Sequence, residues 1–134
     1  MSTSPLCNEE YATLARFRRE LRVFTQFSEH AALNAGLTAQ QYQALLAIRA
    51  SPAIGMRIGE LAREILIRPN SATELVDRLQ ELGLVTRRTS DEDRREVRVV
   101  LTPSSNQVLE SLAAMHRIEL QRIGPLLKEL LARL

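Results

Sequence analysis

Residues 61–102 read LAREILIRPNSATELVDRLQELGLVTRRTSDEDRREVRVVLT, and most of the fold can be predicted from them. Apolar residues recur at helical spacing over Ile58–Leu66, which predicts a short helix. Pro69 suits the first position of a second helix, which is expected to run to Leu82 and to end at Gly83. Two short helices joined by a tight link form a helix-turn-helix.

The apolar pattern changes its period after the second of these helices. Leu84–Arg88 is strand-like, Thr89–Arg95 is polar and charged, and Glu96–Leu101 alternates apolar with polar residues. Two such runs separated by a polar turn predict a β-hairpin, and a hairpin directly after a helix-turn-helix is a wing. Thr102 and Pro103 then provide the N-cap and the first position of another helix.

Two helices are expected upstream of the helix-turn-helix. Apolar residues recur every three or four positions over Glu9–Asn34, which predicts one long helix that stops before Gly36. Thr38 and Gln41 have the spacing of a capping box, in which each side chain bonds the other residue's backbone N–H. A second helix is therefore expected over Ala39–Ala50.

Downstream of the hairpin, a long helix is expected over Pro103–Ile123. Gly124-Pro125 should break or kink it, and a last short helix should cover Leu126–Leu134. This end of the chain carries an apolar stripe too wide for a monomer to leave exposed, so we expect a homodimer. The stripe comprises Leu126, Leu127, Leu130, Leu131 and Leu134.

These elements predict a mainly α fold with a small β-hairpin, built as one domain over residues 1–134. The winged helix-turn-helix lobe is expected at about residues 38–102. The long-helix dimerisation region is expected at about residues 9–36 and 103–134.

Composition narrows the class of protein. Hydrophobic residues make up 45% and charged residues 25%, and no apolar run approaches the roughly 20 residues that span a bilayer. The residues at 1–5 have no signal-peptide character, and Cys7 is the only cysteine, so a cytoplasmic protein is expected. No histidine, cysteine or acidic cluster has metal-ligand spacing, and no catalytic constellation is present, so we expect neither a cofactor nor an enzyme.

The net charge of +2 argues only weakly for a nucleic-acid partner. Lys128 is the only lysine among 18 basic residues, and arginine is the better residue for phosphate and guanine. A GC-rich genome produces the same arginine bias, so the bias alone does not decide between these explanations.

Several short motifs, in this order and spacing, resemble the MarR family of winged-helix transcriptional regulators. They are Leu61-Ala62, Ala72–Leu79, Leu82–Val85, Asp93–Arg95 and Leu101-Thr102. The resemblance covers about residues 9–134. It implies a triangular dimer whose first and last helices interlock and whose two winged lobes bind adjacent major grooves of DNA. It also implies that a small phenolic or lipophilic effector can regulate the protein, or in some members an oxidant.

The sequence departs from the family pattern at four positions. Arg68 replaces the usual Ser or Thr cap of the recognition helix, and Glu74 stands where a basic residue is common. Ser105 replaces a Gly, and Arg57 replaces a Thr. The base sequence that this chain binds therefore cannot be transferred from its relatives.

The helix that starts at Pro69 is expected to enter the major groove. Its core face should carry Ala72, Leu75, Val76, Leu79 and Leu82. Asn70 suits adenine, the Thr73 methyl suits thymine, and Glu74 suits the cytosine amino group. The alternative is that these residues form an ordinary solvated face of the helix. The full set of candidate residues is Arg68, Pro69, Asn70, Ser71, Thr73, Glu74 and Asp77.

The hairpin is expected to hold the flanking minor groove and backbone. Arg94 or Arg95 can enter a narrow minor groove, and the family resemblance implies that Asp93 orients that arginine. A charge-balanced exposed loop is the alternative. The strands contribute Arg87, Arg88 and Arg98 as candidate phosphate contacts.

A ligand pocket is expected between the long helices and the lobe. Its candidate residues are Phe17, Phe24, His30, Met115 and His116, for which packing within a dimer core is the alternative. Cys7 has no resolving cysteine, which favours a plain thiol over a redox sensor.

The expected partners are palindromic duplex DNA, a second copy of the chain and a small aromatic or lipophilic effector. We expect a repressor that the effector relieves. A protein–protein module and a ligand-independent DNA binder are the alternatives.

Overall fold

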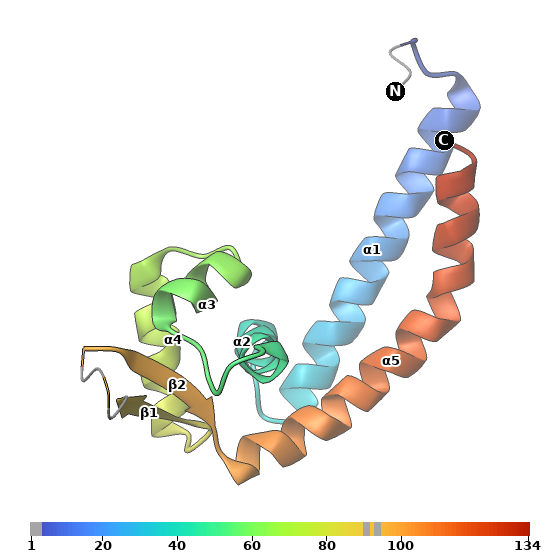
Figure 1. The fold of residues 1–134 in the computed structure, drawn as a ribbon. Helices are drawn as coiled ribbons and strands as arrows, with labels where there is room; N and C mark the ends of the chain where they lie inside the picture. Colours follow the sequence, from blue (N-terminus) through green and yellow to red (C-terminus); the bar gives the residue numbers. More distant parts are fainter. Residues whose placement is uncertain (1–3, 90–91, 93–94) are drawn as a thin grey trace.

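The chain forms a lobe with a long two-helix arm. The computed structural model describes residues 4–89, 92 and 95–134. The lobe contains α2, α3, α4 and the β1–β2 hairpin, and α1 and α5 extend from it side by side, with both termini at the far end of the arm (Figure 1). The elements are α1 (Asn8–Asn34), α2 (Ala39–Ala50), α3 (Ile58–Glu64), α4 (Pro69–Glu81), β1 (Val85–Thr89), β2 (Val97–Leu101) and α5 (Pro103–Ala132).

The sequence pattern located α1 and α2 to within one residue. The capping box at the start of α2 is confirmed in both directions. The Gln41 backbone N–H donates to the Thr38 hydroxyl at 3.1 Å, and the Thr38 N–H donates to the Gln41 side-chain carbonyl at 3.0 Å. This start is determined locally, because two side chains satisfy two N–H groups that the helix leaves unpaired.

The link between α3 and α4 is longer than predicted. The helix ends at Glu64 rather than Leu66, because Leu66 adopts a left-handed conformation with φ of 60° and turns the chain. The Ile67 N–H then donates to the Ala62 carbonyl at 2.9 Å, which closes the turn. Pro69 occupies the first turn of α4, as predicted.

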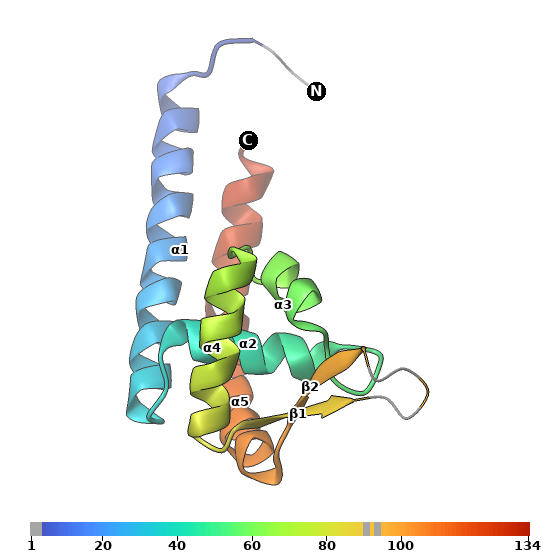
Figure 2. The same cartoon turned by 90° about the vertical axis from the view of Figure 1, so that its left-hand side faces the viewer.

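The core of the lobe collects one face of each of its elements. Ala72, Leu75, Val76 and Leu79 are buried on α4, as the period of the helix predicts. Leu82 is not part of this face. It is 49% exposed and forms the C-cap of α4, which ends at Glu81. α3 packs against both α4 and α2, and Figure 2 shows the hairpin extending beyond them.

The hairpin is anchored to the lobe by a strand pairing that the sequence pattern did not predict. β1 and β2 are antiparallel, with Arg88 opposite Arg98. Met56 forms an isolated bridge with Val99, through hydrogen bonds of 3.0 and 2.8 Å. The preceding Gly55 has φ of 74°, and a Cβ there would lie 2.5 Å from the Val99 carbonyl oxygen. The base of the wing is therefore held by the loop that follows α2.

We expected Gly124-Pro125 to break or kink the helix, and the break, with a separate helix over Leu126–Leu134, is wrong. α5 runs without interruption from Pro103 to Ala132, along a curved path (Figure 1). A proline inside a helix removes one backbone donor and crowds the Cβ of the residue before it. Gly124 has no Cβ, so the chain keeps its helical conformation through Pro125.

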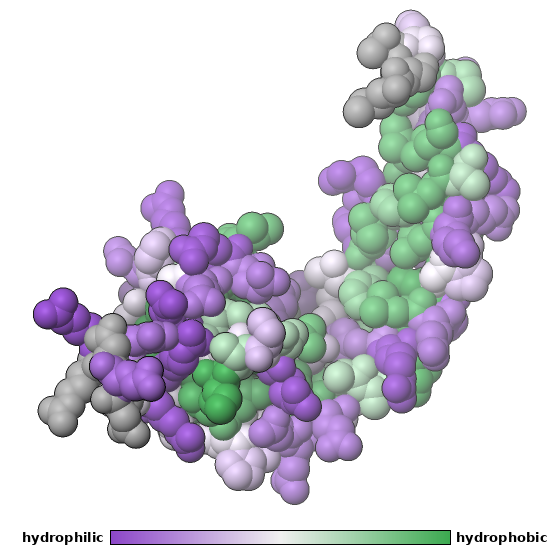
Figure 3. All heavy atoms as spheres, in the orientation of Figure 1, coloured by the Kyte–Doolittle hydropathy of each residue, from purple (hydrophilic) through white to green (hydrophobic). Residues whose placement is uncertain are grey.

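The arm exposes a continuous apolar surface. Figure 3 shows hydrophobic residues running along it, whereas hydrophilic residues dominate the end of the lobe that carries the hairpin. Of the predicted stripe, Leu130 is buried and Leu131 and Leu134 are exposed. No helix in the described ranges is both long and apolar enough to cross a membrane.

Candidate nucleic-acid interface

The N-terminal turns of α4 form an exposed polar edge. Asn70, Ser71, Thr73 and Glu74 are all exposed. The Thr73 hydroxyl donates to the Pro69 carbonyl at 3.1 Å, which leaves the methyl group for an apolar contact such as a thymine. Within the described part of the chain, Asn70, Ser71 and Glu74 form no hydrogen bond or ion pair through their side chains. These groups are available to a partner.

The start of α4 also has the character of an anion site. Its N-cap, Arg68, makes no side-chain capping hydrogen bond, and Pro69 follows at the first position. The free N–H groups of the first turn and the helix dipole both favour a phosphate there. Arg68 is itself exposed, so its guanidinium can contact the same phosphate.

Arg87 and Asp77 are both predicted to contact DNA, but in the structure they form an ion pair with each other. The Arg87 guanidinium on β1 reaches back to α4, where Nη2 lies 2.5 Å from the Asp77 carboxylate. A second nitrogen of the same guanidinium bonds the side-chain carbonyl of Gln80. We call these three residues the wing clamp. Sequence reasoning missed Gln80, since only the fold brings these residues together.

The other strand arginines differ in their surroundings. Arg98 is half-buried, with Nε 2.8 Å from the Glu96 carboxylate and Nη1 donating to the Gly55 carbonyl at 3.3 Å. Arg57, at the start of α3, approaches the same carboxylate at 3.4 Å. Arg88 is exposed and forms no ion pair among the residues that the structure describes. Arg88 is thus the strand arginine best placed for a phosphate.

The residues predicted to contact the minor groove lie between β1 and β2 in the sequence. Asp93 and Arg94 fall outside the described residues, and Arg95 is exposed. Their contact with a minor groove stays a prediction from the sequence.

The predicted ligand pocket is only partly assembled. Phe24 and His116 come together, with ring centroids 5.9 Å apart, whereas His30 and Met115 are exposed and Phe17 is half-buried. The centre of the cluster is His116, which is stacked on Tyr42 at 4.5 Å. Burial raises the pKa of the Tyr42 hydroxyl above its ordinary value. Phe27, at 5.5 Å from His116, completes the cluster.

Hydrogen bonds fix the ring of His116. Nδ1 lies 2.7 Å from the Leu112 carbonyl, which can only accept, so Nδ1 donates. Nε2 then accepts from the Ser28 hydroxyl at 2.8 Å. His116 therefore joins α5 to α1 and packs on α2. This arrangement favours a packing role, although Tyr42 and His116 also line a shallow hollow of about 410 Å³.

A helix-turn-helix followed by a two-stranded wing and flanked by long helices defines a winged-helix protein. Residues 35–96 of the chain match the sequence model of the MarR family. Members of this family include transcriptional regulators, so the match agrees with the expectation of a non-enzymatic protein.

The curated relatives include transcriptional regulators. The transcriptional activatory protein BadR of Rhodopseudomonas palustris is 38% identical over 79 residues, which cover 58% of this chain and 45% of BadR. The chain spans less than half the length of the curated relatives it matches.

Two solved structures share the fold. CouR from Rhodococcus jostii RHA1, bound to p-coumaroyl-CoA, has a TM-score of 0.70 at 24% identity, over 78% of this chain and 73% of CouR. The F27L mutant of S. aureus MepR, bound to an oligodeoxyribonucleotide, has a TM-score of 0.70 at 19% identity, over 86% of this chain and 82% of MepR.

Proposed function

We propose that the chain is a homodimeric transcriptional regulator that binds duplex DNA in a sequence-specific manner. The observation that carries the proposal is the exposed edge of α4. Among the residues that the structure describes, the side chains of Asn70, Ser71 and Glu74 have no partner, and they lie beside a wing that the clamp holds against the same helix. A helix presented in this way fits the major groove, and the wing reaches the flanking backbone. The DNA bound to MepR supports this use of the fold.

The apolar surface of the arm supports a dimer. Exposed apolar residues on both α1 and α5, such as Leu21 and Ile118, would be covered by a second copy. A two-fold axis relates two recognition helices, so the operator is expected to be an imperfect palindrome with half-sites about one helical turn apart.

The sign of regulation and its trigger form the finer part of the proposal. A dimer bound across promoter DNA excludes other proteins, so we propose repression, relieved when a small effector binds. The ligand on CouR supports an effector, whereas the name of BadR indicates activation in that relative. A reporter driven by the chain's own upstream DNA, with and without the protein, distinguishes repression from activation.

Binding itself is tested by fluorescence anisotropy with duplexes selected from a random library. We expect enrichment of a palindromic sequence that binds at least about a thousandfold more tightly than random duplex at physiological salt. Equal affinity for every duplex would contradict sequence-specific binding. Absence of binding would favour a protein–protein module.

A further inference from the structure

The recognition helix α4 and the long helix α5 meet at a hydrogen-bonded junction. α4 is followed by a turn through Gly83, and α5 begins after its N-cap Thr102. The Thr102 hydroxyl donates to the Gly83 carbonyl at 2.8 Å, and the Thr102 N–H donates to the Leu84 carbonyl at 3.2 Å. We infer that Thr102 is a positioning residue that determines which spacing of DNA half-sites the dimer binds. The inference rests on the proposed function for its effect on DNA.

The Gly83 carbonyl is held rigidly relative to the recognition helix. The Gly83 N–H donates to the Gln80 carbonyl at 3.0 Å, and the Leu84 N–H donates to the Leu79 carbonyl at 2.9 Å. This pair of bonds is the Schellman ending of a helix, and it requires the left-handed conformation of Gly83, whose φ is 74°. The acceptor at the junction is therefore fixed to the last turn of α4.

The Thr102 hydroxyl is in turn held rigidly relative to α5. It accepts from the Ser105 N–H at 3.3 Å, and the Ser105 hydroxyl accepts from the Thr102 N–H at 3.0 Å, which completes a capping box. Ser105 is fully buried. Because the Gly83 carbonyl can only accept, the Thr102 hydroxyl donates to it. One side chain thus caps α5 and also bonds the end of the recognition helix.

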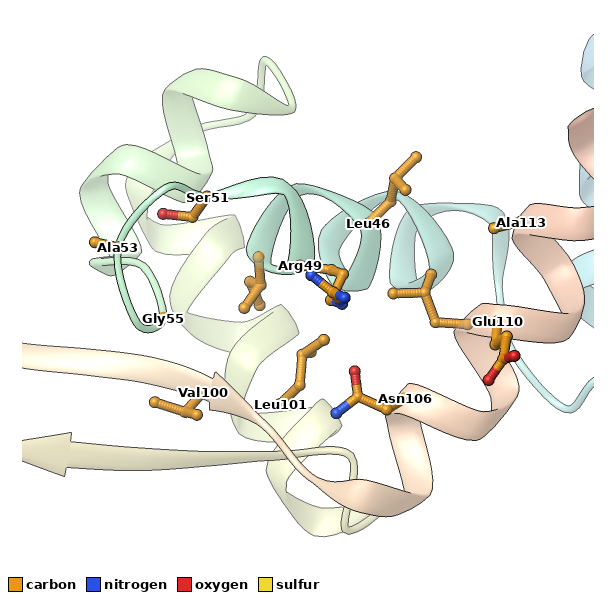
Figure 4. A pocket seen from close by; sticks show the side chains of 12 residues that line it. Leu46, Arg49, Ser51, Ala53, Gly55, Val100, Leu101, Asn106, Glu110 and Ala113 are labelled. Atoms are coloured by element: carbon orange, nitrogen blue, oxygen red, sulfur yellow. The ribbon is translucent and has the colours of Figure 1, made fainter.

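α2 does not support the start of α5 from the other side. A hollow of about 820 Å³ lies between them, with Arg49 of α2 and Asn106 of α5 on facing walls (Figure 4). Asn106 is exposed. Within the described residues, the directional contacts of this first turn with the lobe are therefore the bonds of Thr102.

α5 is held against the lobe at a second point along its length. His116 stacks on Tyr42 of α2, about 21 Å along the helix from Thr102. Leu109 and Leu112 lie in the lobe core between these points, but apolar contacts are not directional. The bonds of Thr102 and the stack of His116 together set the angle between α5 and the lobe.

A small movement at this junction has a larger effect in a dimer. Loss of the bond between Thr102 and Gly83 allows the two groups to separate by about 1 Å. A two-fold axis applies the movement to both lobes, so the distance between the recognition helices changes by up to about 2 Å. Successive base pairs are about 3.4 Å apart. The junction thus controls a distance comparable with one step in half-site spacing.

Three substitutions separate this link from the capping of α5. Thr102→Ser keeps the hydroxyl and therefore both functions. Thr102→Asp keeps an oxygen that caps α5, but its carboxylate has no hydrogen to donate to Gly83. Thr102→Ala loses both functions and tests the inference if Thr102→Asp fails to fold. A role in capping alone predicts that Thr102→Ser and Thr102→Asp behave alike, whereas a positioning role predicts that they differ.

Fluorescence anisotropy measures the preferred spacing with duplexes whose two half-sites are moved together or apart by one or two base pairs. The wild type and Thr102→Ser should prefer one spacing over its neighbours by about tenfold or more. Thr102→Asp and Thr102→Ala should bind neighbouring spacings with affinities within about threefold of one another. Thr38→Asp is the matched control, because Thr38 forms the same capping box at the start of α2, and it should keep the wild-type preference.

Two results with these duplexes would overturn the inference. The first is a wild-type spacing preference in Thr102→Asp or Thr102→Ala. The second is an equal loss of preference in Thr102→Ser or Thr38→Asp.

Distances within one chain provide a test that does not need DNA. Spin labels on cysteines introduced at the exposed Glu81 and Lys128, in a Cys7→Ser protein diluted with unlabelled chain, report the lobe relative to the arm. The wild type and Thr102→Ser should give the same narrow distribution, and Thr102→Asp a broader one or one shifted by about 1–2 Å. This change in a protein that does not bind DNA would support the positioning role and contradict the proposed function. Specific DNA binding with unchanged distances and spacing would do the reverse.

Discussion

At the scale of single residues, Glu74 is the most informative position on α4. It is exposed near the start of the helix and has no ion-pair partner in the described ranges. A carboxylate in a groove flanked by phosphates is repelled unless it meets a hydrogen-bond donor. The amino group of cytosine is such a donor in the major groove.

Glu74→Gln should therefore relax a preference for cytosine at one position of each half-site, by roughly 1–3 kcal/mol. General affinity should stay equal or rise, because one repulsive charge is removed. Selection of duplexes from a random library measures both effects.

Glu81→Gln, at the far end of the same helix, is the matched control and should leave the selected sequences unchanged. Indistinguishable sequence preferences for Glu74→Gln and the wild type would show that Glu74 is only a solvated residue. Specificity would then come from Asn70, Thr73 and the shape of the DNA.

At the scale of elements, the wing clamp determines how β1 lies against α4. Arg87 is held by two side chains of the recognition helix, which argues for a positioning role rather than the phosphate contact predicted from sequence. The two roles differ in a measurable way. Each lost phosphate contact lowers the slope of binding against salt by about one unit, whereas loss of positioning does not.

Arg87→Gln should weaken operator binding, leave the salt slope unchanged and lower the midpoint of thermal unfolding by a few degrees. Arg88→Gln is the matched control, since Arg88 is adjacent but exposed and unpaired in the described structure. It should lower the salt slope with no thermal effect. A lower salt slope for Arg87→Gln would show that Arg87 contacts a phosphate.

The tip of the wing gives a separate prediction. Arg94→Ala combined with Arg95→Ala should weaken binding to all duplexes and lower the salt slope by about one or two units per wing. Folding should be unaffected, because the tip has few apolar residues. Unchanged affinity at physiological salt would show that the tip does not contact DNA.

Local signals predicted most element boundaries, while contacts between distant elements were missed. The start of α2 depends on Thr38 and Gln41 alone, so the sequence was sufficient. The wing clamp and the pairing of Met56 with Val99 depend on the fold and leave no periodic pattern. The sequence therefore predicted the residues of the candidate site, but it did not predict the ion pair between Asp77 and Arg87.

At the scale of the whole molecule, the arm predicts the assembly. Its exposed apolar residues on α1 and α5 make a lone chain unfavourable in water. We expect a dimer in sedimentation at micromolar concentration. Leu21→Glu combined with Ile118→Glu should give monomers and remove operator binding, since one recognition helix holds only one half-site. A monomeric wild-type protein would contradict the dimer and the palindrome together.

The uninterrupted course of α5 through Pro125 has a consequence for the evolution of chain length. α5 is one continuous helix from the wing to the end of the arm. Each inserted residue therefore rotates one end of α5 relative to the other by about 100° around the helix axis. One extra residue near Ile118 would thus put the lobe out of phase with the arm. Insertions and deletions in α5 should be tolerated in steps of about seven residues, which restore the phase after two turns.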